Sequence, residues 1–264
     1  MAKSALQGKS IVIIGGTTGM GLSAAKACVN AGATLVVVGN DPLTSGVARD
    51  ALGDTGRVLT LDATDPKSAE SAIELAVQEF GRLDGLYHVA GGSGRRAGDG
   101  PLHELSDEGW DFTCRLNLSS LIWSNRAAVR QFLKQQTGGS ILNLGSVASY
   151  SPSPKFFATH GYAAAKAGIM GLTTSAAAYY APHNIRFNCI APGLVQTPMS
   201  LRAQNDAAIM EFIRAKQPLD GGRIGKPEDL DAAVVFFLSD GSRVVTGQVL
   251  AIDGGWSVTD GSAS

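Results

Sequence analysis

The sequence predicts an α/β fold: a single domain over residues 1–264, built on a doubly wound, seven-stranded parallel sheet with helices on both faces. Two observations support this prediction. Short apolar, β-branched runs alternate along the chain with longer segments of helical periodicity. No linker-like stretch divides the chain. Because parallel neighbouring strands need long crossovers, which helices usually supply, strict alternation favours a parallel sheet covered on both sides.

Seven runs have the length and apolar content of buried strands, and six segments between them have helical periodicity. The predicted strands are residues 10–14, 34–38, 58–61, 85–89, 140–144, 185–190 and 248–252. The predicted helices are residues 22–31, 44–52, 66–80, 107–136, 162–181 and 227–238. Signals at the ends agree: Pro66 and Pro227 stand at helix starts, and Gly81 stands at a helix end. Ligands are expected at the carboxyl ends of the strands.

The composition argues against nucleic acid and membranes as partners. The formal net charge is −1, and no run of like charge occurs. No stretch reaches the roughly 18 apolar residues of a membrane span, and the first residues lack the apolar core of a signal peptide. We therefore expect a cytoplasmic protein that acts on a small molecule.

The three cysteines are Cys28, Cys114 and Cys189. They are widely spaced among apolar neighbours and form no Cys-x-x-Cys pair. This pattern is typical of reduced, buried cysteines rather than of disulfides or metal ligands. We expect no metal site.

A glycine-rich turn follows the first predicted strand directly. Gly15, Gly19 and Gly21 allow the chain to turn tightly into the next helix. The missing side chains also let a pyrophosphate approach the helix N-terminus, where free amides and the helix dipole favour an anion. Such a turn alone is a weak signal, but its place after the first strand of an alternating chain indicates dinucleotide binding. The expected contacts are Gly15, Thr17, Thr18, Gly19, Met20 and Gly21.

The end of the second predicted strand bears on the form of the cofactor. A carboxylate there binds the adenosine ribose and repels a 2′-phosphate. Asp41, or else Asn40, stands at this place, and residues 15–21 and 38–43 contain no Lys or Arg. These residues favour NAD over NADP. Asp41 is equally suited to capping the following helix, which is a common structural use of aspartate.

Three residues carry the chemical prediction. Tyr162 and Lys166 stand one helical turn apart, and Ser146 follows an apolar strand upstream. A tyrosine with its usual pKa of about 10 transfers protons poorly near neutral pH, and a fixed ammonium at i+4 stabilises the phenolate. We therefore expect Lys166 to lower the pKa of Tyr162. Each residue taken singly has a structural explanation, but together and in this order they indicate a nicotinamide-dependent oxidoreductase.

With these motifs in order, the chain resembles the short-chain dehydrogenase/reductase family over essentially its whole length. Residues 162–166 have the family's Tyr-x-x-x-Lys signature. The resemblance implies a Rossmann-like fold, a nicotinamide cofactor, and an alcohol or carbonyl substrate. It also implies four catalytic residues: Asn117, Ser146, Tyr162 and Lys166.

The resemblance implies further cofactor contacts along the chain. Asp62 resembles the family's acidic residue at adenine, with Ala63 beside it, and Ala90-Gly91 resembles the end of the family's Asn-Asn-Ala-Gly motif. Residues 188–197 resemble the segment that holds the nicotinamide. The contacts expected from that segment and from the catalytic helix are Pro192, Gly193, Val195, Thr197, Tyr162 and Lys166.

The chain departs from the family pattern in three places. Ile14 replaces a threonine whose hydroxyl ties the glycine turn to the fourth strand, and His88-Val89 replaces two asparagines. That tie must therefore be made differently or not at all. A lone histidine at a strand end is more often structural than catalytic. The interval from Ser146 to Tyr162 is also longer than is common, so residues 149–159 are expected to form an enlarged flap over the substrate.

The mechanism implied by the resemblance has Tyr162 exchange a proton with the substrate oxygen while Ser146 holds that oxygen. Hydride passes between the adjacent carbon and the nicotinamide. Lys166 holds the nicotinamide ribose, and Asn117 carries a water that links Lys166 to solvent. The alternative is a catalytically silent dinucleotide-binding regulator or scaffold with the same fold.

The sequence leaves alternatives open for the parts of the chain that would contact substrate and for the number of subunits. Residues 199–222 are either a substrate lid or a plain pair of surface helices. Arg95 and Arg96 either clamp an anionic group of the substrate or are simply solvated. The helices 107–136 and 162–181 carry apolar residues on more than one face, for instance Leu121 and Ile122. They favour a homo-oligomer, either a dimer or a tetramer.

Overall fold

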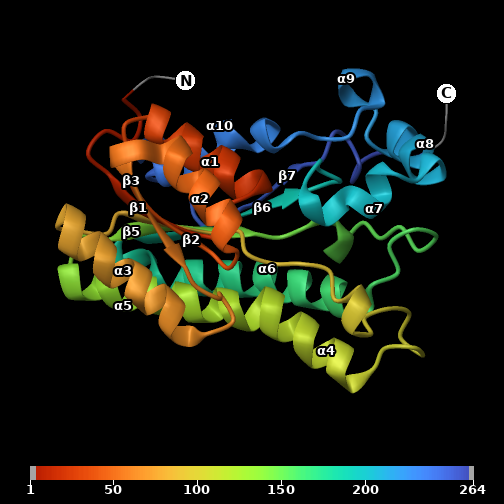
Figure 1. The fold of residues 1–264 in the computed structure, drawn as a ribbon, viewed down its shortest axis with the longest axis horizontal. Coiled ribbons are helices and arrows are strands. Elements are labelled where there is room, and N and C mark those ends of the chain that lie inside the picture. The colour runs from red at the N-terminus through yellow and green to blue at the C-terminus, as the bar shows by residue number, and fades with distance from the viewer. Residues whose placement is uncertain (1–3, 262–264) are drawn as a thin grey trace.

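A computed structural model describes residues 4–261 and confirms the predicted seven-stranded parallel sheet (Figure 1). The strands are β1 (Ser10–Ile14), β2 (Thr34–Gly39), β3 (Gly56–Thr60), β4 (Gly85–His88), β5 (Gly139–Leu144), β6 (Ile185–Pro192) and β7 (Val249–Ile252). Their order is β3-β2-β1-β4-β5-β6-β7, and all neighbouring pairs are parallel. The chain builds outward from β1, returns to β4 and builds outward again, which is a doubly wound arrangement.

The predicted domain span of residues 1–264 includes residues 1–3 and 262–264, which lie outside the described residues. Within residues 4–261 the strand ends agree with the predicted ends to within a few residues. The largest differences are at β3, which begins at Gly56 rather than Val58, and at β6, which continues to Pro192.

Helices cover both faces of the sheet, as predicted (Figure 1). One face carries α1 (Gly19–Asn30), α2 (Pro42–Leu52) and α10 (Asp231–Leu238). The other carries α3 (Pro66–Phe80), α5 (Ser120–Gln135) and α6 (His160–Tyr180). The remaining helices are α4 (Asp107–Cys114), α7 (Leu201–Gln204), α8 (Ala207–Lys216) and α9 (Leu219–Gly222).

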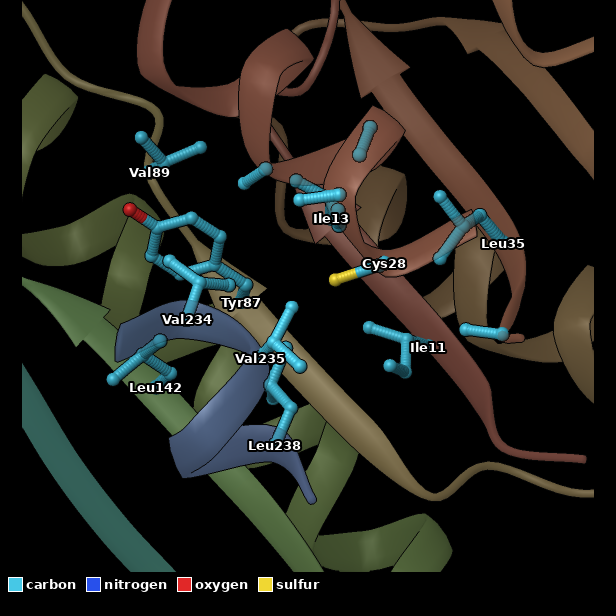
Figure 2. Packing of buried hydrophobic residues seen from close by; sticks show 14 of the residues in the cluster. Ile11, Ile13, Cys28, Leu35, Tyr87, Val89, Leu142, Val234, Val235 and Leu238 are labelled. Carbon is cyan, nitrogen blue, oxygen red and sulfur yellow. The ribbon is translucent and has the colours of Figure 1, made fainter. Parts of the chain in front are cut away.

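Two hydrophobic cores lie on opposite faces of the sheet because alternate residues of a strand point to opposite sides. Ile11 and Ile13 belong to the core under α1 and α10, whereas Val12 and Ile14 belong to the core under α3 and α5. Figure 2 shows the first core, in which side chains of α10 face Tyr87 on β4. Burial on both faces explains why the strands are continuous apolar runs rather than alternating ones.

The predicted helix 107–136 is wrong in one respect: it is interrupted by a π-helical turn at Arg115–Ser119, hereafter the π-turn. Two side chains bind carbonyls that an unbroken helix would use. The Asn117 Nδ2 donates to the Thr113 carbonyl at 2.9 Å, and the Ser120 Oγ donates to the Leu116 carbonyl at 2.6 Å. Such turns often occur at functional positions.

The prediction of buried cysteines is confirmed for Cys28 and Cys189 and is wrong for Cys114, which is half-buried. Cys114 ends α4, a helix that buries only Gly109 and Thr113. All three are free thiols. Among residues 4–261, no group of three His, Cys, Asp or Glu side chains is placed to hold a metal ion. Nor does that part of the chain contain a helix long and apolar enough to cross a membrane.

Asp231, at the start of α10, is a carboxylate in an unfavourable place. Its Oδ2 accepts a hydrogen bond from the Ser23 Oγ of α1 at 2.8 Å, while its buried Oδ1 has no partner among the described residues. Burial raises the pKa of Asp231 to about 6, and the nearby charges of Glu228 and Asp229 act in the same direction. The folded chain therefore prefers the protonated acid.

We expect Asp231→Asn to stabilise the protein above about pH 7. A raised carboxyl pKa contributes stability that is fully present below the unfolded pKa of about 4 and is lost as the pH rises through about 6. The amide removes this loss and still accepts from Ser23. The gain is roughly 1 kcal/mol after discounting for the partial exposure of Asp231. Urea unfolding at about pH 8 and about pH 5 measures it, with the exposed Asp50→Asn as control. A gain that is equal at both pH values would contradict the assignment.

Candidate active site

A cleft of about 230 Å³ opens at the carboxyl edge of the sheet, where the strand order reverses beside β1. The predicted site residues that line it are Gly15, Thr17, Thr18, Gly19, Met20, Gly21, Asn40, Asp62, Ala63, Ala90, Gly91, Tyr162, Lys166 and Thr197. The lining residues that the sequence prediction missed are Val38, Gly39, Leu61, Val89, Gly92, Leu116, Leu144, Pro198 and Met199. Many of these lie at strand ends, a position that by itself indicates the binding edge.

The glycine turn is a backbone cradle that side chains would fill. Gly15 has φ +90°, and a Cβ on it would lie 2.5 Å from the Ala90 nitrogen. A Cβ on Gly21 would lie 2.1 Å from the Gly15 carbonyl oxygen. The turn leads into α1, whose N-cap Thr18 makes no side-chain capping bond. A close main chain and a helix N-terminus fit the pyrophosphate of a dinucleotide.

The tie between the glycine turn and β4 is made by the main chain. Ile14 offers its carbonyl, which accepts from the Val89 nitrogen at 2.9 Å and from the Ala90 nitrogen at 2.8 Å. The side chains that the family pattern uses for this purpose are therefore not required here. Instead, the apolar Ile14 side chain is buried in the core.

His88 has a structural environment. Its Nδ1 is 2.7 Å from the Ser124 Oγ and its Nε2 is 3.4 Å from the Ser120 Oγ. Burial lowers the pKa of His88 to about 3, and the charge of Lys166 acts in the same direction. His88 is therefore neutral at physiological pH. Because Ser120 also binds the Leu116 carbonyl in the π-turn, the histidine braces that turn from β4.

Asn40 and Asp41, predicted to contact the adenosine ribose, have different roles in the structure. Asn40 lines the cleft, and Asp41 does not. Asp41 caps α2, with its Oδ1 accepting from the Thr44 nitrogen at 2.7 Å. Of the two uses of Asp41 that the sequence left open, the structure shows the cap. Asp62 and Ala63 line the same end, and the Asp62 Oδ1 accepts from the Thr64 nitrogen.

Tyr162 and Lys166 line the cleft, whereas Ser146 and Asn117 lie beside it and are not among its lining residues. The Ser146 side chain lies close enough to that of Tyr162 to act on the tyrosine pKa, which it lowers. The Lys166 Nζ donates to the Leu144 carbonyl at 2.8 Å and lies 5.6 Å from the centre of the Tyr162 ring. Lys166 is only 2% exposed, so its ammonium is almost fully desolvated.

The sequence predicts that Lys166 lowers the pKa of Tyr162, and this prediction is wrong: in the folded chain the pKa is raised. Burial raises the pKa of Tyr162 to about 12, and Ser146 opposes that rise. Burial also lowers the pKa of Lys166 to about 8. Desolvation disfavours both charged forms, and this effect outweighs the attraction that the i+4 spacing predicts. The phenol is thus protonated at neutral pH.

Asn117 lies in the π-turn with its side chain completely buried and fully hydrogen-bonded. Its Oδ1 accepts from the Gly92 nitrogen at 3.0 Å, and its Nδ2 donates to the Gly92 carbonyl at 2.9 Å. A Cβ on Gly91 would lie 2.7 Å from the Asn117 Oδ1 and 3.5 Å from the Lys166 Nζ. The amide and the ammonium therefore border the same small space beside Gly91.

Asp99 is a positioning residue that the sequence prediction missed. Both of its carboxylate oxygens accept from the first turn of α6, from the Gly161 and Tyr162 nitrogens, each at 2.9 Å. The side chain is 4% exposed. A carboxylate at a helix N-terminus satisfies free amides and complements the helix dipole. Asp99 is distant from Tyr162 in sequence and lies in an irregular loop, so no local pattern reveals it.

Of the nicotinamide-binding segment expected from the sequence, only part lines the cleft. Thr197 lines the cleft together with Pro198 and Met199. The other three expected residues, Pro192, Gly193 and Val195, are not among the lining residues. The Gly193 nitrogen donates to the Ile252 carbonyl at 3.3 Å, and Val195 is 6% exposed. They hold the segment in place rather than border the cleft.

Residues 199–222 lie against residues 149–159 through aromatic side chains. Phe212 of α8 lies 5.2 Å from Phe156, measured between ring centres, and 5.6 Å from Trp256. Phe157 lies 5.8 Å from Trp256. Ile209 and Ile213 of α8 are fully buried in the same cluster. The two segments therefore form one apolar cover over this part of the sheet edge.

Comparison with known proteins agrees with this architecture. The family model described as enoyl-(acyl carrier protein) reductase matches residues 15–257. The chain is 36% identical over 257 residues to 2-dehydro-3-deoxy-D-gluconate 5-dehydrogenase of Dickeya dadantii, covering 95% of this chain and 96% of that protein. It is 35% identical over 254 residues to the 3-oxoacyl-(acyl-carrier-protein) reductase FabG of Thermotoga maritima, covering 95% and 98%.

A solved structure shows the same relationship in three dimensions. A short-chain type dehydrogenase/reductase from Mycobacterium ulcerans superposes with a TM-score of 0.88 at 29% identity, covering 97% of this chain and 92% of that one. The sheet order, the glycine cradle and the Ser, Tyr and Lys cluster are what such a relationship requires. From its sequence, its fold and its relatives alike, this chain belongs to the short-chain dehydrogenase/reductase family, whose members are oxidoreductases that use nicotinamide cofactors.

Proposed function

We propose that the chain interconverts an alcohol and a carbonyl compound with NAD as cofactor, and that Tyr162 is the general acid and base. The observation that carries this proposal is that Tyr162 and Lys166 line the cleft that also contains the glycine cradle, with Ser146 next to Tyr162. The whole chain acts as one dinucleotide-binding and catalytic domain. Residues 199–222, packed on residues 149–159, serve as its substrate lid.

The protonated phenol is the form that carbonyl reduction requires. The bound cofactor supplies hydride to the carbon that bears the substrate oxygen. Ser146 and Tyr162 donate hydrogen bonds to that oxygen, where negative charge grows, so they stabilise the transition state more than the ground state. Tyr162 then gives up its proton. A phenol with a pKa of about 12 holds that proton until the oxygen becomes basic.

Lys166 and Asn117 restore the proton. The pKa of Lys166, lowered to about 8, lies near physiological pH, so its ammonium both donates and regains a proton readily. The Asn117 amide and the Lys166 ammonium both lie beside Gly91. A water there would link the ammonium to solvent. Lys166 also faces the expected place of the nicotinamide ribose, because it lines the cleft next to Gly91.

A catalytically silent dinucleotide-binding regulator is the less favoured function. Such a protein has no need of a desolvated lysine and tyrosine in its cleft, and burying these groups costs stability. The relatives described above are named as a dehydrogenase and a reductase. Cofactor binding without turnover of any alcohol or ketone in a broad panel would favour the regulator.

We expect Tyr162→Phe to lower kcat by about 10² to 10⁴-fold, because the acid and base is removed while the ring remains. The dissociation constant for NADH should change less than about threefold. Stopped-flow absorbance and fluorescence titration measure the two quantities. Tyr179→Phe, at the exposed end of the same helix, is the matched control and should keep full activity. Turnover retained by Tyr162→Phe would remove this tyrosine from the mechanism.

We expect tighter binding of NADH than of NADPH by the unaltered chain, because residues 15–21 and 38–43 offer no cation to a 2′-phosphate. Asn40→Arg adds a guanidinium at the cleft and should raise the affinity for NADPH by about tenfold. Asp41→Asn is the control: asparagine caps a helix as well as aspartate, so the preference should persist. Fluorescence titration of both cofactors decides the matter, and a clear preference for NADPH would refute the proposal.

We further propose a homo-oligomer, a dimer or a tetramer. Leu121 does not support this, since it is buried within the chain. Apolar side chains on α4 and α5 do: Trp110 is 43% exposed, Phe112 is 48% exposed and Ile122 is 39% exposed. Light scattering should show a particle of at least twice the chain mass of 27.2 kDa. Ile122→Asp should reduce its size, since it places a charge in the contact. A monomer at all concentrations would disprove the assembly.

A further inference from the structure

We propose that Arg95 and Arg202 form a site for an anionic oxygen group, a carboxylate or a phosphate, on the substrate. The observation is a convergence of two guanidinium groups on one neutral acceptor. The Arg95 Nη2 and the Arg202 Nη2 each donate to the Phe156 carbonyl oxygen at 3.2 Å. This inference rests on the proposed function, because it assigns the anion to the substrate of that cleft.

The three residues come from three segments, two of which contribute lining residues to the cleft. Arg95 lies in the loop between β4 and α4, the loop that also supplies Gly92 to Asn117. Phe156 lies between Ser146 and Tyr162, and Arg202 lies in α7, shortly after Pro198 and Met199. In Figure 1 the segment after β5 runs in green between α7 and α8 on one side and the yellow loop before α4 on the other. The guanidinium pair thus joins the loop after β4 and the segment after β6, both of which contribute lining residues to the cleft, to the segment that follows Ser146.

The charges of this pair are not balanced by a carboxylate. No ion pair within residues 4–261 includes Arg95 or Arg202. The nearby Asp99 raises the pKa of Arg95, but both of its oxygens already accept amides of α6. Burial lowers the pKa of Arg95, and the charge of Arg202 acts in the same direction. The two positive charges of Arg95 and Arg202 thus lie near the same carbonyl group. An anion bound between them would reduce the repulsion between these charges.

A carboxylate or a phosphate is the group that fits this geometry. Each offers at least two oxygens. Each guanidinium could therefore donate to a charged oxygen of its own, whereas at present both donate to the single carbonyl oxygen of Phe156. Lys155, whose Nζ lies 5.0 Å from the centre of the Phe156 ring, adds a third positive charge nearby. Of the two arginines that the sequence singled out, the structure selects Arg95. Its partner is Arg202 rather than the adjacent Arg96, whose side chain makes no hydrogen bond or ion pair within residues 4–261.

The test measures binding directly and so does not depend on turnover. Cyclohexanecarboxylate, cyclohexyl phosphate and the neutral methyl cyclohexanecarboxylate are titrated into the full chain by calorimetry, with and without NADH. We expect at least one anion to bind ten or more times more tightly than the ester. Arg95→Gln and Arg202→Gln should each weaken that anion about tenfold, which is roughly 1.4 kcal/mol, and should leave the ester unchanged. The anion that binds identifies the group.

Arg96→Gln is the matched control, since it removes one positive charge from the loop that contains Arg95. Its effect on anion binding should stay within about twofold. Equal weakening by all three variants would show a general positive field and would overturn the site, as would anions that bind no better than the ester. Because Arg95 and Arg202 lie in separate segments, misfolding of one variant leaves the other decisive. Tyr162→Phe should still bind the anion, so failure of the catalytic proposal is seen separately from failure of this site.

Discussion

The reversal of strand order between β1 and β4 is the constraint on which the rest of the structure depends. Parallel strands on both sides of this point end at the same edge, and the chain leaves that edge in opposite directions, so a cleft must open there. Main-chain hydrogen bonds join the two strands at the base of the cleft, because the Ile14 carbonyl accepts from the Val89 and Ala90 nitrogens. Contact this close is possible only because Gly15 has no Cβ.

The cleft removes polar side chains from water, which disfavours the folded state, and hydrogen bonds to these side chains reduce that penalty. Lys166 and Tyr162 are removed from water, which disfavours their charged forms. Each is retained by a specific partner, Lys166 by the Leu144 carbonyl and Tyr162 by Ser146. A buried polar group with a partner costs far less than one without. The same desolvation brings the pKa of the lysine close to the physiological range, which is what the proposed proton transfer requires.

Around this pair, buried side chains from distant segments fix positions rather than react. Asn117 ties the π-turn to the Gly92 loop, and His88 braces that turn from β4 through Ser120. Asp99 holds the first turn of α6, from which Tyr162 projects. Rigid support of this kind matters because small displacements of a proton donor reduce its efficiency sharply. The Phe156 carbonyl, shared by Arg95 and Arg202, connects the loop after β4 to α7.

The sequence alone determined what depends on local pattern. Strand runs, the glycine turn and the Tyr-x-x-x-Lys spacing are set by periodicity and by residue type, so the sheet was predicted correctly and most residues that line the cleft are among those named from the sequence. Only the tertiary structure decided what depends on packing between distant segments: the cap by Asp41, the π-turn at Asn117, the role of Asp99 and the pairing of Arg95 with Arg202. It also reversed the expected pKa shift of Tyr162, because desolvation is a property of the folded surroundings and not of the spacing of two residues.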